Sequence, residues 1–120
     1  MMKSYRDLIV WQKSVDVVTL VYKLMKQFPD DEKYGLTSQI KRSSVSISSN
    51  IAEGYGRNYT KDYARFLQIA RGSLFEMQTQ LQIAVNLSFI NNGDLKEIKN
   101  LSIEIEKMLN VLIKKLMSSA

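Results

Sequence analysis

Aromatic and basic side chains alternate over residues 55–65 of the chain. The alternating residues are Tyr55, Arg57, Tyr59, Lys61, Tyr63 and Arg65. Lys and Arg neutralise phosphates, and the face of a Tyr ring stacks on an unpaired base at roughly 1–3 kcal/mol per base. A turn with only a structural role does not require this alternation. The pattern therefore predicts contact with nucleic acid.

Not every member of this run is expected to bind. Tyr63 falls on the apolar seam of a predicted helix, which leaves Tyr55 and Tyr59 as the stacking pair. Other basic residues of the same region complete the predicted nucleic-acid-binding set, which is Lys41, Arg42, Tyr55, Arg57, Tyr59, Lys61, Arg65 and Arg71.

A structural role for the same arginines is an open alternative. Arg57 and Arg65 could pair with Glu53, Asp62 or Glu76 and fasten two helices or two subunits, since arginine and carboxylate form strong bidentate contacts. Salt dependence separates the two hypotheses, because phosphate binding weakens steeply as salt rises.

The composition excludes several kinds of catalytic centre. The chain has no Cys and no His, so thiolate and imidazole zinc sites, the Glu-x-x-His ligands of di-iron bundles and His-dependent triads are all excluded. The sequence also lacks a glycine-rich phosphate loop and a nucleophile–base constellation. We expect a protein that is not an enzyme, with no catalytic residues, no metal and no cofactor.

The charge balance favours an anionic partner. Seventeen basic and twelve acidic residues leave a net charge of +5, and residues 38–75 contain six of the basic and two of the acidic ones. Such a cluster suits RNA, DNA or another polyanion. The apolar runs are far below the roughly 18 residues of a membrane span, and the amino terminus lacks a signal-peptide pattern. These features, with the absence of Cys, predict a cytoplasmic protein with no membrane partner.

Apolar residues recur with helical spacing in four segments, which predicts an all-α, antiparallel up-and-down four-helix bundle in one domain, residues 1–120. The first helix has two neighbouring series, Leu8, Trp11, Val15, Val18, Tyr22 and Met25 as the seam and Val10, Val17, Val21, Leu24 and Phe28 beside it. The second has Leu36, Ile40, Ile47 and Ile51 and ends at Gly54 and Gly56.

The last two helices are the most regular. The third is expected to begin at an N-cap, Thr60, and its seam is Tyr63, Leu67, Ala70, Leu74, Met77, Leu81 and Ala84. The fourth follows a turn at residues 91–93 and a capping box of Asp94 with Glu97, and its seam is Leu95, Ile98, Leu101, Ile105, Leu109, Leu112 and Leu116.

The helices have more apolar surface than one bundle needs. The first helix is apolar on two sides, the third has Ile69, Gly72 and Ile83 opposite its seam, and the second has Val45 opposite its core. The surplus predicts a closed homo-oligomer that hides these side chains. The alternative is that they are scattered surface hydrophobes of the kind that monomers tolerate.

Several sequence motifs together resemble a known family. They are Asp7-Leu8 with Val10-Trp11-Gln12, Phe28-Pro29, residues 34–40 (Tyr-Gly-Leu-Thr-Ser-Gln-Ile), residues 48–57 (Ser-Ser-Asn-Ile-Ala-Glu-Gly-Tyr-Gly-Arg), Phe66-Leu67, and Ala70-Arg71-Gly72-Ser73 followed by Glu76. Over nearly its full length the chain resembles the four-helix bundle proteins encoded by intervening sequences within bacterial 23S ribosomal RNA genes. Ser48 stands where many relatives are expected to have Pro, which should straighten the second helix without abolishing the fold.

The resemblance implies a four-helix protomer and a pentameric, barrel-like ring. The family is also similar to the accessory protein of diversity-generating retroelements, a basic pentamer that binds nucleic acid and a reverse transcriptase. We therefore expect a homo-oligomer, with a pentamer favoured, that binds RNA or DNA, with structured RNA as the preferred ligand. The competing hypothesis is a scaffold whose main ligand is a protein partner.

Overall fold

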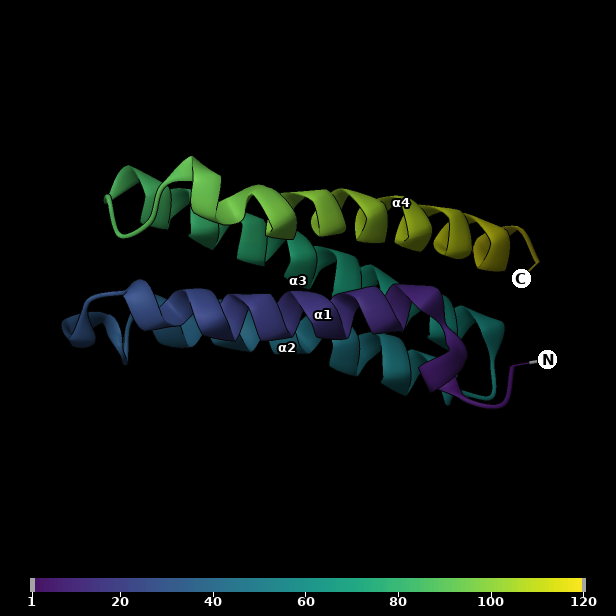
Figure 1. Ribbon diagram of the computed structural model, residues 1–120. Helices are drawn as coiled ribbons and strands as arrows, with labels where there is room; N and C mark the ends of the chain where they lie inside the picture. The colour runs from purple at the N-terminus through teal and green to yellow at the C-terminus, as the bar shows by residue number, and fades with distance from the viewer. Residues whose placement is uncertain (1, 120) are drawn as a thin grey trace.

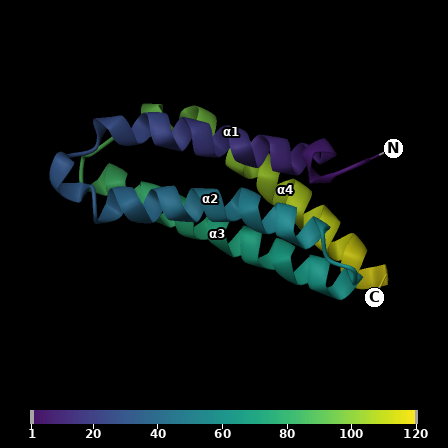
Figure 2. The ribbon, with the colours of Figure 1, turned by 90° about the horizontal axis from the view of Figure 1, so that it is seen from below.

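Four long helices form an antiparallel up-and-down bundle (Figures 1 and 2). The computed structural model describes residues 2–119, with side chains to residue 118. The helices are α1 (Ile9–Leu24), α2 (Leu36–Tyr55), α3 (Thr60–Asn86) and α4 (Lys96–Ser119), with short 3-10 turns at Tyr5–Asp7, Met25–Gln27, Asp30–Glu32 and Asn92–Leu95. Each helix packs on the next and α4 packs on α1, so the predicted all-α fold is confirmed.

The core stripe of α1 differs from the predicted seam. Val17 and Val21 are completely buried, whereas Tyr22 of the predicted seam is exposed. The stripe passes through Ser14, which is also buried because its hydroxyl donates a hydrogen bond to the carbonyl of Val10 (2.7 Å). Because a polar residue interrupts this stripe, the sequence pattern placed it beside the seam and not at its centre. The second apolar series is therefore the core face, while of the first series only Leu8 and Met25 are buried.

Small residues allow α2 and α3 to pack closely. A Cβ placed on Gly54 would lie 3.1 Å from Cδ1 of Tyr63 and 2.7 Å from Cβ of Phe66, and the second distance is shorter than real Cβ contacts reach. Serines link the same pair of helices, since the Ser43 hydroxyl donates to Gln80 Oε1 (2.8 Å). Gly54 thus lies inside α2 as a packing residue and does not end it.

The helix ends lie close to the predicted positions, with two corrections. The N-cap of α3 is Tyr59, not Thr60, and no side chain caps it. The capping box before α4 is formed by Asn91 and Asp94, one turn earlier than predicted, with each side chain accepting from the other residue's backbone N–H. Asn91 can do this because its short amide side chain bonds the backbone of the same turn. α2 continues through Ser48 without a break, as expected where Pro is absent.

The predicted seams of α3 and α4 lie in the core, and the half-buried members are Tyr63 of α3 and Leu101, Leu112 and Leu116 of α4. The reverse face of α3 is exposed: Ile69, Ile83 and Leu87 project from it, and nothing lies within 4 Å of a Cβ built on Gly72. The accessible surface is 7398 Å², against about 6,600 Å² for a typical monomer of this mass. The elongated bundle, 45 × 24 × 22 Å, therefore exposes a surplus. None of the described helices is long and apolar enough to cross a bilayer.

Candidate nucleic-acid interface

The two ends of the bundle differ in charge. One end, called here the termini end, gathers residues 2–8, the α2–α3 turn with its flanks (residues 53–66) and the last turns of α4 (residues 111–118) (Figure 1). It contains seven basic and three acidic side chains, so it accounts for +4 of the net charge of +5. The opposite end, residues 23–40 and 84–99, contains five of each. The positive charge is thus concentrated at one end of the molecule.

Two arginines of the termini end lie over one aromatic ring. The guanidinium carbon of Arg57 is 4.5 Å from the ring centroid of Phe66, and that of Arg65 is 5.7 Å from it. Neither arginine forms an ion pair with Glu53, Asp62 or Glu76 within the described protomer. The ring orients both cations through exposed cation–π contacts, each of which stabilises by about 0.5–1 kcal/mol, and it leaves their charge uncompensated by carboxylates.

The two tyrosines of the predicted stacking pair have different surroundings. Tyr59 is 71% exposed, and no ring contact with it is found in the described part of the chain. Tyr55 is half-buried and packs edge-on against Tyr63, with ring centroids 6.1 Å apart. Burial raises the pKa of Tyr63 above its ordinary value of 10.0, and the neighbouring Tyr55 adds to this rise. Tyr59 therefore has the accessible ring face.

The remaining predicted residues lie elsewhere. Lys41 packs over the ring of Tyr22 between α1 and α2, with Nζ 4.8 Å from the centroid. Arg42 is exposed on α2, about 22 Å along the helix axis from Arg57 at 1.5 Å per residue. Arg71 is half-buried and donates from Nη1 to Asn110 Oδ1 (2.8 Å), which links α3 to α4. The structure therefore brings together Arg57, Tyr59, Lys61 and Arg65 and separates them from Lys41, Arg42 and Arg71.

Four further cations belong to the termini end and are not part of the predicted binding set. They are Lys3, Arg6, Lys114 and Lys115, from the two ends of the chain. No local motif marks them. An up-and-down bundle with four helices places the start of the first helix, the middle turn and the end of the last helix together, so the topology itself was the available signal.

The described residues contain no group of three or more carboxylates, cysteines or histidines that could hold a metal ion. The chemistry available at the termini end is therefore cationic and aromatic: salt-sensitive attraction of phosphates, stacking on a base, and hydrogen bonding by guanidinium groups.

Comparison with known proteins identifies relatives of the chain. Residues 6–111 match the family described as 23S rRNA-intervening sequence protein. A solved structure from Bacteroides thetaiotaomicron, described as a protein of unknown function from the S23 ribosomal protein family, superimposes with a TM-score of 0.81 at 29% sequence identity. The match covers 88% of this chain and 99% of that one. None of the curated proteins matches the chain.

Proposed function

Since the chain belongs to the 23S rRNA-intervening sequence protein family, we propose that it is a non-enzymatic homo-oligomer that binds structured RNA through the termini ends of its protomers. The observation that carries this proposal is the surplus of four positive charges at that end, beside an exposed Tyr59. The binding residues are Arg57, Tyr59, Lys61 and Arg65.

The electrostatic argument starts from counterion release. Each phosphate that a cation neutralises frees condensed counterions, so a cluster of cations without carboxylate partners is an efficient polyanion site. Arg57 and Arg65 meet this condition because a ring, not a carboxylate, holds them. Tyr59 favours RNA with unpaired bases over duplex DNA, since loops and bulges offer base faces on which an aromatic side chain stacks.

Self-association is supported by the exposed apolar face of α3. Ile69, Ile83 and Leu87 lie on that face with Gly72, and a Gly in the middle of a helix costs about 1 kcal/mol relative to Ala. A neighbouring helix packed on this face would bury the apolar side chains and use the space at Gly72. The resemblance favours a pentamer. Repetition of a weak site around a closed ring raises avidity when the ligand reaches more than one site.

The test compares two triple variants in binding to a hairpin RNA with an unpaired loop. Arg57→Ala with Lys61→Ala and Arg65→Ala removes three cations from the termini end, and Lys33→Ala with Lys96→Ala and Lys99→Ala removes three from the opposite end. Between about 50 and 200 mM salt, the first variant should bind the RNA at least tenfold more weakly than the wild type. Its plot of log binding constant against log salt concentration should have a slope smaller in magnitude by about 2–3. The second variant should bind within about twofold of the wild type. Equal binding by all three proteins would overturn the proposal.

The competing role, a scaffold for a protein partner, makes a different prediction for the same variants. If Arg57 and Arg65 bridge subunits, their loss should lower the mass of the assembly measured by light scattering, and the wild type should show no salt-sensitive RNA binding. An unchanged mass together with weakened RNA binding supports the RNA-binding proposal.

A further inference from the structure

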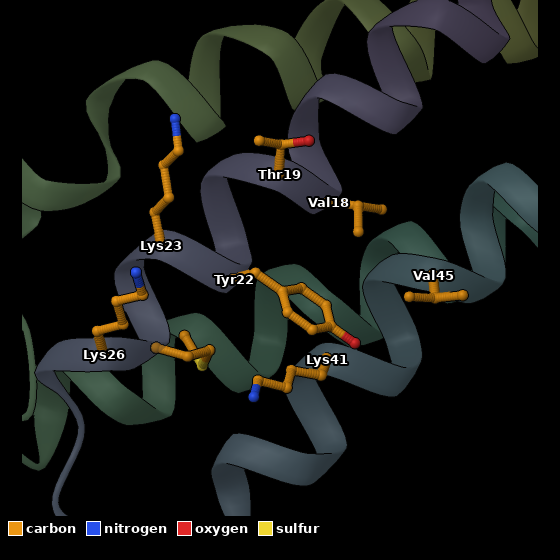
Figure 3. Close-up of a pocket in the computed structure, with 8 residues that line it drawn as sticks. Val18, Thr19, Tyr22, Lys23, Lys26, Lys41 and Val45 are labelled. Atoms are coloured by element: carbon orange, nitrogen blue, oxygen red, sulfur yellow. The ribbon is translucent and has the colours of Figure 1, made fainter.

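A groove between α1 and α2 combines cations with an apolar floor. Its walls include Val18, Tyr22, Lys26, Lys41 and Val45, and no carboxylate belongs to its lining. Figure 3 shows the ring of Tyr22 spanning the space between the two helices, with the amines of Lys26 and Lys41 on one side of it and Val18 and Val45 on the other. We call this feature the lysine groove. It has a basic half and an apolar half.

The connector between α1 and α2 has the opposite character. Asp30 and Asp31 are exposed and form no ion pair within the described protomer, and Tyr34 is 90% exposed. We call residues 30–34 the acidic connector. Within the protomer the amine of Lys33 lies over the Tyr34 ring, with Nζ 5.6 Å from the centroid. A Tyr side chain this exposed buries large area at low entropic cost when a partner covers it.

The acidic connector does not dock in the groove of its own chain. A 3-10 turn, Asp30–Glu32, and a hydrogen bond from the Leu36 backbone N–H to Glu32 Oε1 (3.1 Å) hold it at the start of α2. Val45, in the apolar half of the groove, lies about 14 Å further along the same helix, at 1.5 Å per residue, and Tyr34 is exposed. Asp30 and Asp31 form no ion pair with Lys26 or Lys41 within the described protomer, so the connector is open to a second molecule.

We propose that the acidic connector of one protomer docks in the lysine groove of a neighbouring copy, with Asp30 and Asp31 at Lys26 and Lys41 and the Tyr34 ring on Val18 and Val45. This inference rests on the self-association in the proposed function and adds a second contact between neighbouring copies to the one at the exposed face of α3. A second copy is favoured over another protein because both complementary surfaces, in charge and in apolar area, are present on this one chain. Two different surfaces on the same molecule make a head-to-tail contact, which closes a ring when the rotation between copies permits.

The test uses charge reversal and its compensation. The connector variant is Asp30→Lys with Asp31→Lys, the groove variant is Lys26→Glu with Lys41→Glu, and the swapped variant combines all four substitutions. Light scattering at micromolar concentration should give the mass of the assembly for the wild type. Each double variant should have the mass of the 13.8 kDa protomer, and the swapped variant should regain the mass of the assembly. Recovery is expected because every junction in the swapped protein again joins opposite charges.

A matched control is Lys96→Glu with Lys99→Glu, which makes the same charge change near the same end but outside the groove and should keep the wild-type mass. Circular dichroism melting shows that each double variant is folded. Wild-type mass for both double variants would overturn the contact while leaving self-association intact. A failure of the swapped variant to reassemble would also overturn it. A monomeric wild type would overturn the self-association on which the contact rests.

Discussion

Each end of the bundle presents an exposed tyrosine, but the two rings lie in regions of different net charge. At the termini end Tyr59 lies next to cations in a region with a surplus of four positive charges. At the other end Tyr34 has the amine of Lys33 over its ring and follows the acidic residues 30–32, in a region with no net charge. An exposed aromatic residue therefore does not by itself determine which partner binds. The surrounding charge does, and it favours a polyanion at one end and a basic groove at the other.

The α2–α3 turn is built differently from the turns of the opposite end, although Ser4 and Asp7 form a capping box elsewhere at the termini end. The opposite end is stabilised by local caps of backbone N–H groups. The side chains of Asn91 and Asp94 each accept a hydrogen bond from the other residue's backbone N–H, and Glu32 accepts one from the backbone N–H of Leu36. At the termini end the tight approach at Gly54 and the ring of Phe66 hold the turn, and its cations remain available. Capping uses polar side chains locally, which leaves fewer of them for a ligand.

The largest expected effect separates the two tyrosines. Tyr59→Ala should weaken binding of a hairpin RNA by about 1–3 kcal/mol, the range for loss of base stacking, without changing the assembly mass. Tyr34→Ala should lower the assembly mass at a given concentration and leave the intrinsic affinity of each RNA site unchanged. Fluorescence anisotropy and light scattering measure the two properties. The same response from both variants would contradict a division of roles between the ends.

The next effect concerns the packing that positions the termini end. Gly54→Ala forces a Cβ to 2.7 Å from Cβ of Phe66, an atom too close to the backbone to rotate away. Overpacking of this kind costs about 1–3 kcal/mol, partly offset by about 1 kcal/mol of helix propensity. Urea unfolding at fixed protein concentration should therefore show a net loss of up to about 2 kcal/mol.

The matched control for that variant is Gly72→Ala on the outer face of α3. Nothing lies within 4 Å of its new Cβ in the protomer, so the helix should gain up to about 1 kcal/mol. A lower assembly mass for Gly72→Ala would place a close neighbour on that face. Equal destabilisation by the two substitutions would show that the short approach at Gly54 does not matter.

The smallest effect is a pH dependence at the termini end. Because burial raises the pKa of Tyr63 above 10.0, the folded protein holds that proton more tightly than the unfolded chain does. The contribution to the free energy of unfolding is therefore fully present below pH 10 and is lost as pH rises through the folded pKa. Tyr63→Phe should remove this part of the decline above pH 10, and Tyr59→Phe, at an exposed ring, should not. Denaturant unfolding at a series of pH values measures the difference.

Much of the architecture follows from local patterns. The regular spacing on α3 and α4 predicted their core faces, because a helix with one apolar stripe has one way to bury it. The core face of α1 was assigned to the wrong one of its two apolar series, because Ser14 interrupts the buried one. Residue type alone does not show that Ser14 can be buried. It can, because its hydroxyl donates a hydrogen bond to the carbonyl of Val10 in the preceding turn. Gly54 was misassigned for a similar reason: a glycine near a helix end serves either as a stop or as a close contact, and only the neighbouring helix distinguishes them.

By itself the sequence determined the helices, their order and the family, since periodicity and motif are properties of neighbouring residues. Only the tertiary structure decided which charges act together. It joined Lys3 and Lys114 to the α2–α3 turn, and it separated Lys41, Arg42 and Arg71 from that turn although they are closer in the chain. The physical reason is that electrostatic attraction depends on distance in space, and a bundle of antiparallel helices brings residues from distant parts of the chain to one end while it carries residues of one helix far apart.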